Sequence, residues 1–318
     1  MKTSLLRRSL LATASAVMLM GALLHNTPVQ AQAQNKVVLR VSTPAVPDAW
    51  HAKMWTVFKD SLDKSAPGEF DVQINLNASL FKQGTEPAAM ARGNLELAAI
   101  SAQDIAKILP EYAIFGTAYL IRDPDHQQKV FNGPIGAEMY KAVAEKMDVQ
   151  ILAVAYLGTR QINLREIRAV KTPADLKGVK LRMPGSKEWL FLGEALGATP
   201  TPLAFGEVYL GLKTGTIDGQ DNPLPTVRAA KFYEVTKQIV LTGHLIDGVF
   251  ISISSKSYNA MNAAQKQKVN AAAQALPHST TKTTSRKKPN CLTSSSSRAF
   301  RSPRRMWMLS ASRCRPPT

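Results

Sequence analysis

The fold is decided by the stretch from residue 196 to residue 224, which reads LGATPTPLAFGEVYLGLKTGTIDGQDNPL. Its apolar residues predict a helix over residues 205–212 and a short strand over 216–219. A predicted strand at 179–183 and a predicted helix at 187–196 precede these elements, and a further helix is expected at 226–233. Short strands that alternate with amphipathic helices are typical of an α/β protein with a largely parallel sheet.

The same alternation runs through the chain on both sides of this stretch. Further strands are predicted at 37–41, 70–76, 95–100, 149–155 and 249–253, and further helices at 49–62, 86–92, 136–147 and 257–275. Two strand-and-helix series joined by extended segments predict two lobes with a cleft between them, and small ligands bind in such clefts. We assign residues 34–157 to lobe I, to which about 248–276 return, and residues 158–247 to lobe II.

The distribution of charge argues against a nucleic-acid binder, although the chain of 318 residues has a formal charge of +17. Three of the 40 basic residues lie in residues 1–33 and ten lie in residues 277–318, and neither segment holds an acid. The remaining residues carry 27 bases against 23 acids, so they lack a strongly basic surface. Both cysteines, Cys291 and Cys314, lie in the basic tail. No disulfide, cysteine-zinc site or thiol nucleophile is therefore expected in the body.

Residues 1–33 have the pattern of an export signal. Lys2, Arg7 and Arg8 precede an apolar run over about residues 10–24, and Ala31 and Ala33 stand at small-residue cleavage positions. The run is shorter than the roughly 20 residues that span a membrane. We expect this signal peptide to be cleaved and the protein to be periplasmic, with Sec and twin-arginine export both open.

The tail, residues 277–318, is rich in Ser, Thr, Arg and Pro and lacks apolar periodicity. A disordered basic extension would explain this composition. We favour a second interpretation, in which the tail is frameshifted, because residues 278–312 read one base over can encode a charged amphipathic helix, a strand and the start of another helix. Either interpretation predicts an aberrant, disordered tail that does not pack on the body.

The sequence contains no recognisable catalytic or phosphate-binding motif, and the five histidines lack metal-ligand spacing. We therefore expect no cofactor and no metal. Two arginines near predicted strand ends remain, Arg160 and Arg182. An arginine in a cleft can present its planar fork to a carboxylate through two charge-assisted hydrogen bonds. The plainer alternative for either arginine is a surface ion pair.

Three motifs in this order resemble the DctP-type solute-binding subunit of tripartite ATP-independent periplasmic (TRAP) transporters. They are GTRQINLR at 158–165, DLKGVKLRMP at 175–184 and the stretch at 196–224, and the resemblance covers about residues 36–276. It implies an α/β, two-lobed periplasmic binding protein fold that closes around a small organic acid. Such a receptor is not an enzyme. It delivers its ligand to a membrane permease driven by an ion gradient, and we expect a monomer without a nucleic-acid partner.

The resemblance also implies roles for single residues. Arg182 matches the arginine that pairs with the ligand carboxylate, Arg160 a second arginine of the cleft, Asn222 an amide that bonds the ligand, and Phe205 an apolar wall residue. After the predicted strand at 95–100 the family often supplies a polar contact, for which Ser101 and Gln103 are the candidates here. Trp189 either roofs the cleft or packs in the core.

An exported enzyme acting on an organic acid in the same cleft is the alternative function. It needs a general base near the arginines, and Glu207, Asp218 and Asp221 are the candidates. Helix N-terminal charge and turn hydrogen bonding explain these three residues without catalysis. The identity of the acid stays open, with dicarboxylates, sugar acids, hydroxy acids and keto acids all compatible.

Overall fold

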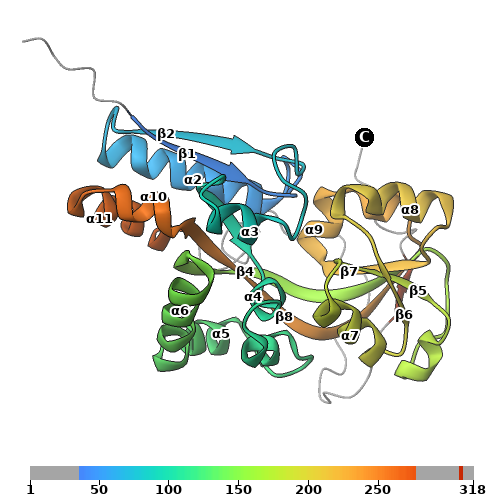
Figure 1. Cartoon of the computed structure of the whole chain (residues 1–318). Coiled ribbons are helices and arrows are strands. Elements are labelled where there is room, and N and C mark those ends of the chain that lie inside the picture. Colours follow the sequence, from blue (N-terminus) through green and yellow to red (C-terminus); the bar gives the residue numbers. More distant parts are fainter. Residues whose placement is uncertain (1–35, 277–307, 311–318) are drawn as a thin grey trace, which may run out of the picture. The chain divides into compact units, whose positions relative to one another are not determined.

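The computed structural model describes residues 36–276 and 308–310, and it divides the chain after residue 36, so the elements below belong to the unit that begins at Val37. One mixed sheet with strand order β2-β1-β3-β8-β4-β7-β5-β6 forms its centre (Figure 1). The strands are β1 (Val37–Ser42), β2 (Phe70–Asn75), β3 (Leu97–Ile100), β4 (Val149–Leu164), β5 (Lys180–Met183), β6 (Thr199–Pro202), β7 (Gly219–Pro223), β8 (Gln238–Ser254) and β9 (Met308–Ser310), which pairs with β8.

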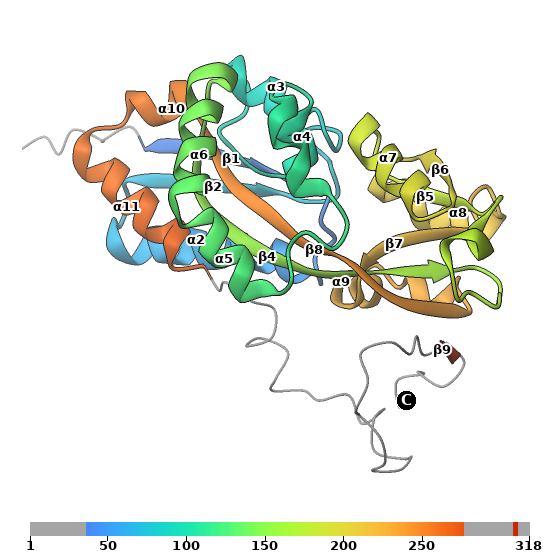
Figure 2. The ribbon, with the colours of Figure 1, turned by 90° about the horizontal axis from the view of Figure 1, so that it is seen from below.

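The sheet is parallel at its two ends and antiparallel in its middle, which corrects the prediction of a largely parallel sheet. β1 pairs in parallel with β2 and β3, and β5 does so with β6 and β7. Between these groups the long strands β4 and β8 run antiparallel to each other, as Figure 2 shows. Both strands are much longer than the predicted strands at 149–155 and 249–253. The sequence pattern missed the rest of β4 because the polar residues there hide the apolar alternation.

Helices cover both faces of the sheet. The α-helices are α2 (Trp50–Ser65), α3 (Glu86–Ala91), α4 (Ala102–Ala106), α5 (Pro124–Phe131), α6 (Pro134–Met147), α7 (Lys187–Ala195), α8 (Val208–Thr214), α9 (Leu224–Ala229), α10 (Ser255–Ala260) and α11 (Ala263–Gln274). Four 3₁₀ helices complete the list: η1 (Pro110–Gly116), η2 (Pro173–Leu176), η3 (Phe205–Glu207) and η4 (Phe232–Glu234).

The core of the first half of the sheet, formed by β1 to β3 with the adjoining ends of β4 and β8, lies on both faces. On β3, Leu97 joins a cluster with Trp55 of α2 and Val269 of α11, while the next residue, Ala98, joins a second cluster with Met139 of α6. Successive side chains of a strand point to opposite faces. This alternation therefore places α2 and α11 on one face and α6 on the other.

The second half of the sheet, formed by β5 to β7 with the other ends of β4 and β8, has its own apolar clusters. Leu181 of β5 packs with Trp189 and Leu192 of α7, and Val208 of α8 packs with Val227 of α9. Separate cores on the two halves fit a two-lobed fold. The lobe boundaries at residues 157 and 247 stay predictions.

The long strands are irregular where they pass between the halves. The register of β4 against β8 shifts at three places, between Ile151 and Ala153, Tyr156 and Gly158, and Arg160 and Ile162. Gly158 has a φ of +142°, and a Cβ atom added there would collide with the side chain of Pro223. Bulges bend strands and break the ladder locally, so the pairing of β4 with β8 is interrupted between the two halves.

Several predicted elements differ in their bounds. The predicted helix at 257–275 is two helices, since Met261 is extended and Asn262 caps α11 in a capping box with Gln265. The predicted strand at 216–219 is shifted to β7. The sequence pattern also missed β6, α4, α5, η1 and η2, which are short or weakly periodic.

The expectations for the two ends of the chain fall mostly outside the described residues. The signal peptide at 1–33 lies outside them, as does the tail at 277–318 apart from β9. Those three residues pair with Gln238, Ile239 and Val240 of β8, where no ordered element was expected. Within the described residues no helix has both the length and the apolarity needed to cross a membrane.

Candidate functional site

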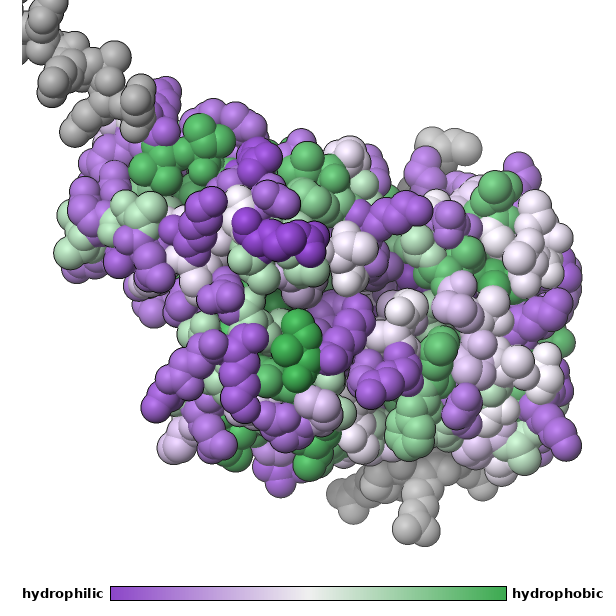
Figure 3. Space-filling view, in the orientation of Figure 1, coloured by the Kyte–Doolittle hydropathy of each residue, from purple (hydrophilic) through white to green (hydrophobic). Residues whose placement is uncertain are grey.

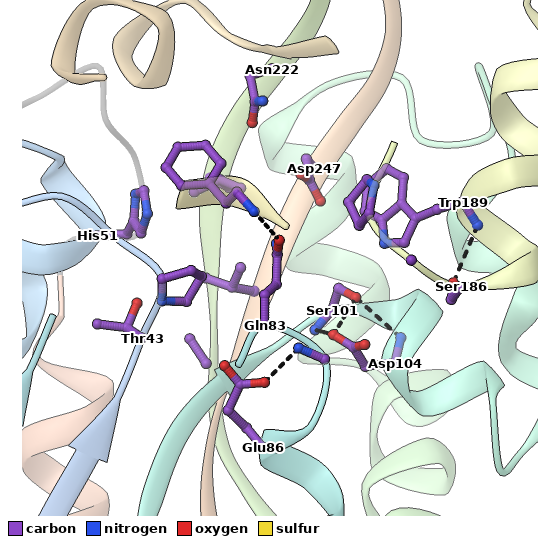
Figure 4. A pocket seen from close by; sticks show the side chains of 18 of the residues that line it. Thr43, His51, Gln83, Glu86, Ser101, Asp104, Ser186, Trp189, Asn222 and Asp247 are labelled. Atoms are coloured by element: carbon purple, nitrogen blue, oxygen red, sulfur yellow. Dashed lines mark hydrogen bonds between the residues drawn. The ribbon is translucent and has the colours of Figure 1, made fainter. Parts of the chain in front are cut away.

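A cavity of about 110 Å³ lies between the two halves of the sheet (Figure 4). Residues of the first half line it, among them Thr43, His51, Gln83, Glu86, Ser101 and Asp104. From the second half come Arg182, Ser186, Trp189, Phe205, Asn222 and Thr226, while Arg160 and Asp247 stand on the long strands. The face of the molecule that Figure 3 shows mixes hydrophilic and apolar residues without one continuous apolar patch.

Among the described residues, Arg182 is the buried cation of this cavity without a carboxylate partner. It lies within β5, is 1% exposed, and its Nε donates to the carbonyl oxygen of Leu203 at 2.8 Å. Its Nη2 donates to the amide oxygen of Gln83 at 2.9 Å, and both acceptors are neutral. Burial lowers the pKa of Arg182 to about 9, although the charge of Asp221 offsets part of this effect. A buried guanidinium whose charge is not compensated is stabilised by an anion that binds to it.

Arg160, in contrast, is neutralised by the protein itself. Its Nε lies 2.6 Å from Oδ2 of Asp221, and its Nη1 lies 2.6 Å from Oδ2 of Asp247. Burial alone would lower the pKa of Arg160, but the two carboxylates outweigh it and raise that pKa. His244, fully buried, contacts the same oxygen of Asp221 at 3.2 Å. Arg160 therefore lines the cavity as part of a compensated ion cluster and not as a free anion site.

Three predicted residues form the walls beside the arginines. The Arg160 guanidinium stacks on Trp189 at 4.6 Å from the ring centre, and Trp189 both lines the cavity and packs in an apolar cluster. The Phe205 ring lies 5.9 Å from Arg182. Asn222 lies inside β7 rather than on a loop, and one of its amide N–H groups is bound to Gln220 at 2.6 Å. Its other donor position and its oxygen remain for a ligand.

The two candidates after β3 differ in position. Ser101 lines the cavity, but its hydroxyl is also the N-cap of α4 and bonds Asp104 at 2.8 Å. Gln103 does not line the cavity, which corrects its place in the predicted site. It is buried, and its side chain packs against Gly116 of η1. The helix that begins at the Ser101 cap turns residue 103 away from the cavity.

The sequence reasoning missed Gln83 and Glu86, which precede and begin α3. Glu86 is 4% exposed, and its Oε2 accepts the backbone N–H of Gly84 at 2.6 Å. Burial raises the pKa of Glu86 to about 7, and backbone N–H groups counteract only part of this shift. The polar run KQGTE reads as a loop without periodicity. The position of this loop beside the arginines is set by the tertiary fold and cannot be read from the local sequence.

Glu86→Gln is expected to change the pH dependence of stability. Because burial raises the pKa of Glu86 from 4.5 to about 7, its contribution to stability is fully present below pH 4.5 and is lost as the pH rises through 7. A glutamine cannot ionise, so the variant should gain up to about 3 kcal/mol over the wild type above pH 7. Urea unfolding at pH 4.5 and pH 8 measures the difference. If the variant and the wild type differ in free energy of unfolding by the same amount at both pH values, the prediction is wrong.

The three general bases of the enzyme alternative are engaged away from the cavity. Glu207 accepts the backbone N–H of Ala204 at 3.3 Å, and Asp218 accepts that of Lys180 at 2.9 Å. Asp221 is held by Arg160. Among the residues described, none of the three lines the cavity. The site can bind a carboxylate at Arg182 and hydroxyl groups at the surrounding polar side chains.

Comparison with known proteins confirms the resemblance. Residues 42–299 match the family described as bacterial extracellular solute-binding protein, family 7. A solute-binding protein of Verminephrobacter eiseniae is 32% identical over 74% of this chain and 70% of its own. The sialic acid-binding periplasmic protein of Vibrio cholerae is 30% identical over 70% of this chain and 69% of its own.

A solved structure agrees in fold as well. The TRAP periplasmic solute-binding protein of Roseobacter denitrificans, bound to 3-deoxy-D-manno-oct-2-ulosonic acid, is 45% identical over 75% of this chain and 78% of its own, with a TM-score of 0.71. These matches confirm the two-lobed α/β binding-protein fold and describe receptors rather than enzymes. The chain belongs to family 7 of the bacterial extracellular solute-binding proteins, the DctP family of TRAP transporter receptors.

Proposed function

We propose that this protein is a periplasmic receptor that binds a small organic acid in the cavity between its halves, with the carboxylate at Arg182. The observation that carries the proposal is the buried guanidinium of Arg182, which neutral oxygens hold without compensating its charge. A ligand carboxylate supplies that charge and forms strong charge-assisted bonds to the remaining N–H groups. Asn222 and the polar residues opposite it bind the rest of the ligand.

The charges that line the cavity favour a monocarboxylate with several hydroxyl groups over a dicarboxylate. Among the described lining residues, Lys107 pairs with Asp104 at 2.8 Å and Arg160 with Asp247, which leaves Arg182 as the cation without a carboxylate. A second ligand carboxylate would face Glu86 and Asp104 instead of a free cation. Hydroxyl groups, in contrast, can donate to these same carboxyl oxygens. Sugar acids have this combination of groups.

Ligand contacts with both halves stabilise the closed form of the receptor, and this closed form is the signal to the transporter. The irregular part of β4 around Gly158 allows the halves to move, and a ligand that contacts both favours the closed state. We expect the closed receptor to deliver its ligand to a TRAP permease in the membrane. The ligands bound in related structures include 3-deoxy-D-manno-oct-2-ulosonic acid, L-galactonate and D-erythronate. They support a sugar acid as the ligand class here.

A thermal-shift screen of acids tests the proposal. The panel consists of 3-deoxy-D-manno-oct-2-ulosonic acid, L-galactonate, D-erythronate and galacturonate, with succinate as the dicarboxylate. A ligand present at 100 times its Kd stabilises the folded protein by about 2.7 kcal/mol. We expect at least one sugar acid to raise the melting temperature and succinate to have a smaller effect. A response to succinate alone would overturn the sugar-acid class, and a response to none would overturn the proposed ligand.

Asn222→Ala is expected to weaken binding of the responding acid by about 1–3 kcal/mol, because a neutral group loses its partner. The amide is buried in β7 and lines the cavity. Isothermal titration calorimetry measures the change in Kd. Asn132→Ala is the matched control, since Asn132 is an exposed residue at the end of α5. Tighter binding by Asn222→Ala would contradict the assignment.

A further inference from the structure

Gln83 connects the two halves across the cavity at the proposed carboxylate site. It lies between β2 and α3, on the first half. Its amide oxygen accepts two N–H groups of the second half, Nη2 of Arg182 at 2.9 Å and the backbone N of Phe205 at 3.1 Å. Figure 4 shows this side chain extended into the cavity with a hydrogen bond at its oxygen.

The charge of the groups that accept hydrogen bonds from Arg182 is as important for anion binding as their position. The amide oxygen of Gln83 and the carbonyl oxygen of Leu203 fix two nitrogens of Arg182 without adding an opposing charge. Arg160 shows the contrary case in the same cavity, since two carboxylates both fix and neutralise it. A carboxylate at position 83 would likewise consume the charge of Arg182. The side-chain acceptors of the two arginines therefore differ in charge: Gln83 is neutral, whereas Asp221 and Asp247 are carboxylates.

We propose that Gln83 is a positioning residue that aims Arg182 at the ligand while leaving its charge free. The inference rests on the proposed carboxylate site. Leu203 holds Nε of Arg182 from within the second half, but Gln83 belongs to the first half, so the second anchor, at Nη2, forms only when the halves approach each other. Gln83 thereby links closure to the completion of the anion site, and its neutrality keeps that site selective for acids.

Two substitutions separate the charge of the acceptor from its mere presence. Gln83→Glu keeps the size of the side chain and the bridge, but its carboxylate pairs with Arg182. We expect it to weaken binding of the responding sugar acid at least a hundredfold, and to leave the ligand-free melting temperature equal to or above that of the wild type. Gln83→Ala removes the bridge and should weaken binding by about tenfold, with a lower ligand-free melting temperature.

Gln265→Glu is the matched control, because it adds the same charge at the capping box of α11, where an acidic residue is equally suitable. It should bind as the wild type does. Gln83→Glu binding within threefold of the wild type would overturn the inference, as would an equal loss in Gln83→Glu and Gln83→Ala. A lower ligand-free melting temperature for Gln83→Glu would overturn it even without a ligand.

The Arg182→Lys variant distinguishes this inference from the proposed function. If Arg182→Lys binds the acid normally, the carboxylate site itself is wrong. If Arg182→Lys loses binding while both Gln83 variants keep it, the site stands and the role of Gln83 is wrong. Calorimetry on the three variants, with L-galactonate and 3-deoxy-D-manno-oct-2-ulosonic acid as probes, gives these outcomes directly.

Discussion

Arg182→Lys is expected to weaken binding of the organic acid by about 3 kcal/mol, or roughly a hundredfold. The ammonium group of lysine keeps the positive charge but cannot form the planar fork that meets both carboxylate oxygens. It also cannot bond Leu203 and Gln83 at once in the geometry that holds the guanidinium. The loss therefore combines poorer contact with poorer positioning. Calorimetry with the acid that responds in the thermal-shift screen measures it.

Arg40→Lys provides the control for this substitution. Arg40 also uses its fork, since its Nε and Nη2 bond the two carboxylate oxygens of Glu96 at 2.7 Å, but it lies on β1 and does not line the cavity. Its replacement should leave the affinity unchanged. If Arg182→Lys binds within threefold of the wild type while folding normally, the assignment of Arg182 to the carboxylate is wrong.

The strand and helix patterns predicted most elements, and the three motifs predicted the positions of Arg160, Arg182, Phe205 and Asn222 at one cavity. The sequence patterns could not predict the direction of the strands, because apolar alternation is the same in parallel and antiparallel strands. The continuation of β4 past residue 155 was missed for a related reason. The polar side chains of this part line a cavity or form ion pairs instead of packing in an apolar core.

The different states of the two arginines also could not be read from the motifs. Arg160 and Arg182 both stand in strands, yet carboxylates compensate the charge of Arg160 and not that of Arg182. The difference depends on Asp247 of β8, which is 87 residues from Arg160 in the chain. Gln83, which holds Arg182, comes from a loop 99 residues away. Such partners become visible only when the fold brings the strands together.

Asp221→Asn is expected to cause the largest loss of stability. Asp221 is fully buried and bonds both Arg160 and His244. Burial would raise the pKa of Asp221, but the charge of Arg160 outweighs it and lowers that pKa, so the carboxylate is charged in the folded protein. Removing one partner of a buried ion pair typically costs about 3–5 kcal/mol, because the other charge remains desolvated. Asp247 stays as a second partner for Arg160, so the expected loss is about 3 kcal/mol, at the lower end of this range.

Urea unfolding tests this loss against Asp63→Asn, which removes an exposed ion pair with Lys59 at 2.7 Å on α2. Exposed pairs contribute about 0–1 kcal/mol, so the control should be nearly neutral. If both variants lose less than about 1 kcal/mol, the Arg160 cluster does not stabilise the fold as its geometry indicates. If Asp221→Asn alone is destabilised, the cluster is a structural element beneath the ligand site. Arg160 then serves mainly to hold β4, β7 and β8 together, and the acid is left to Arg182.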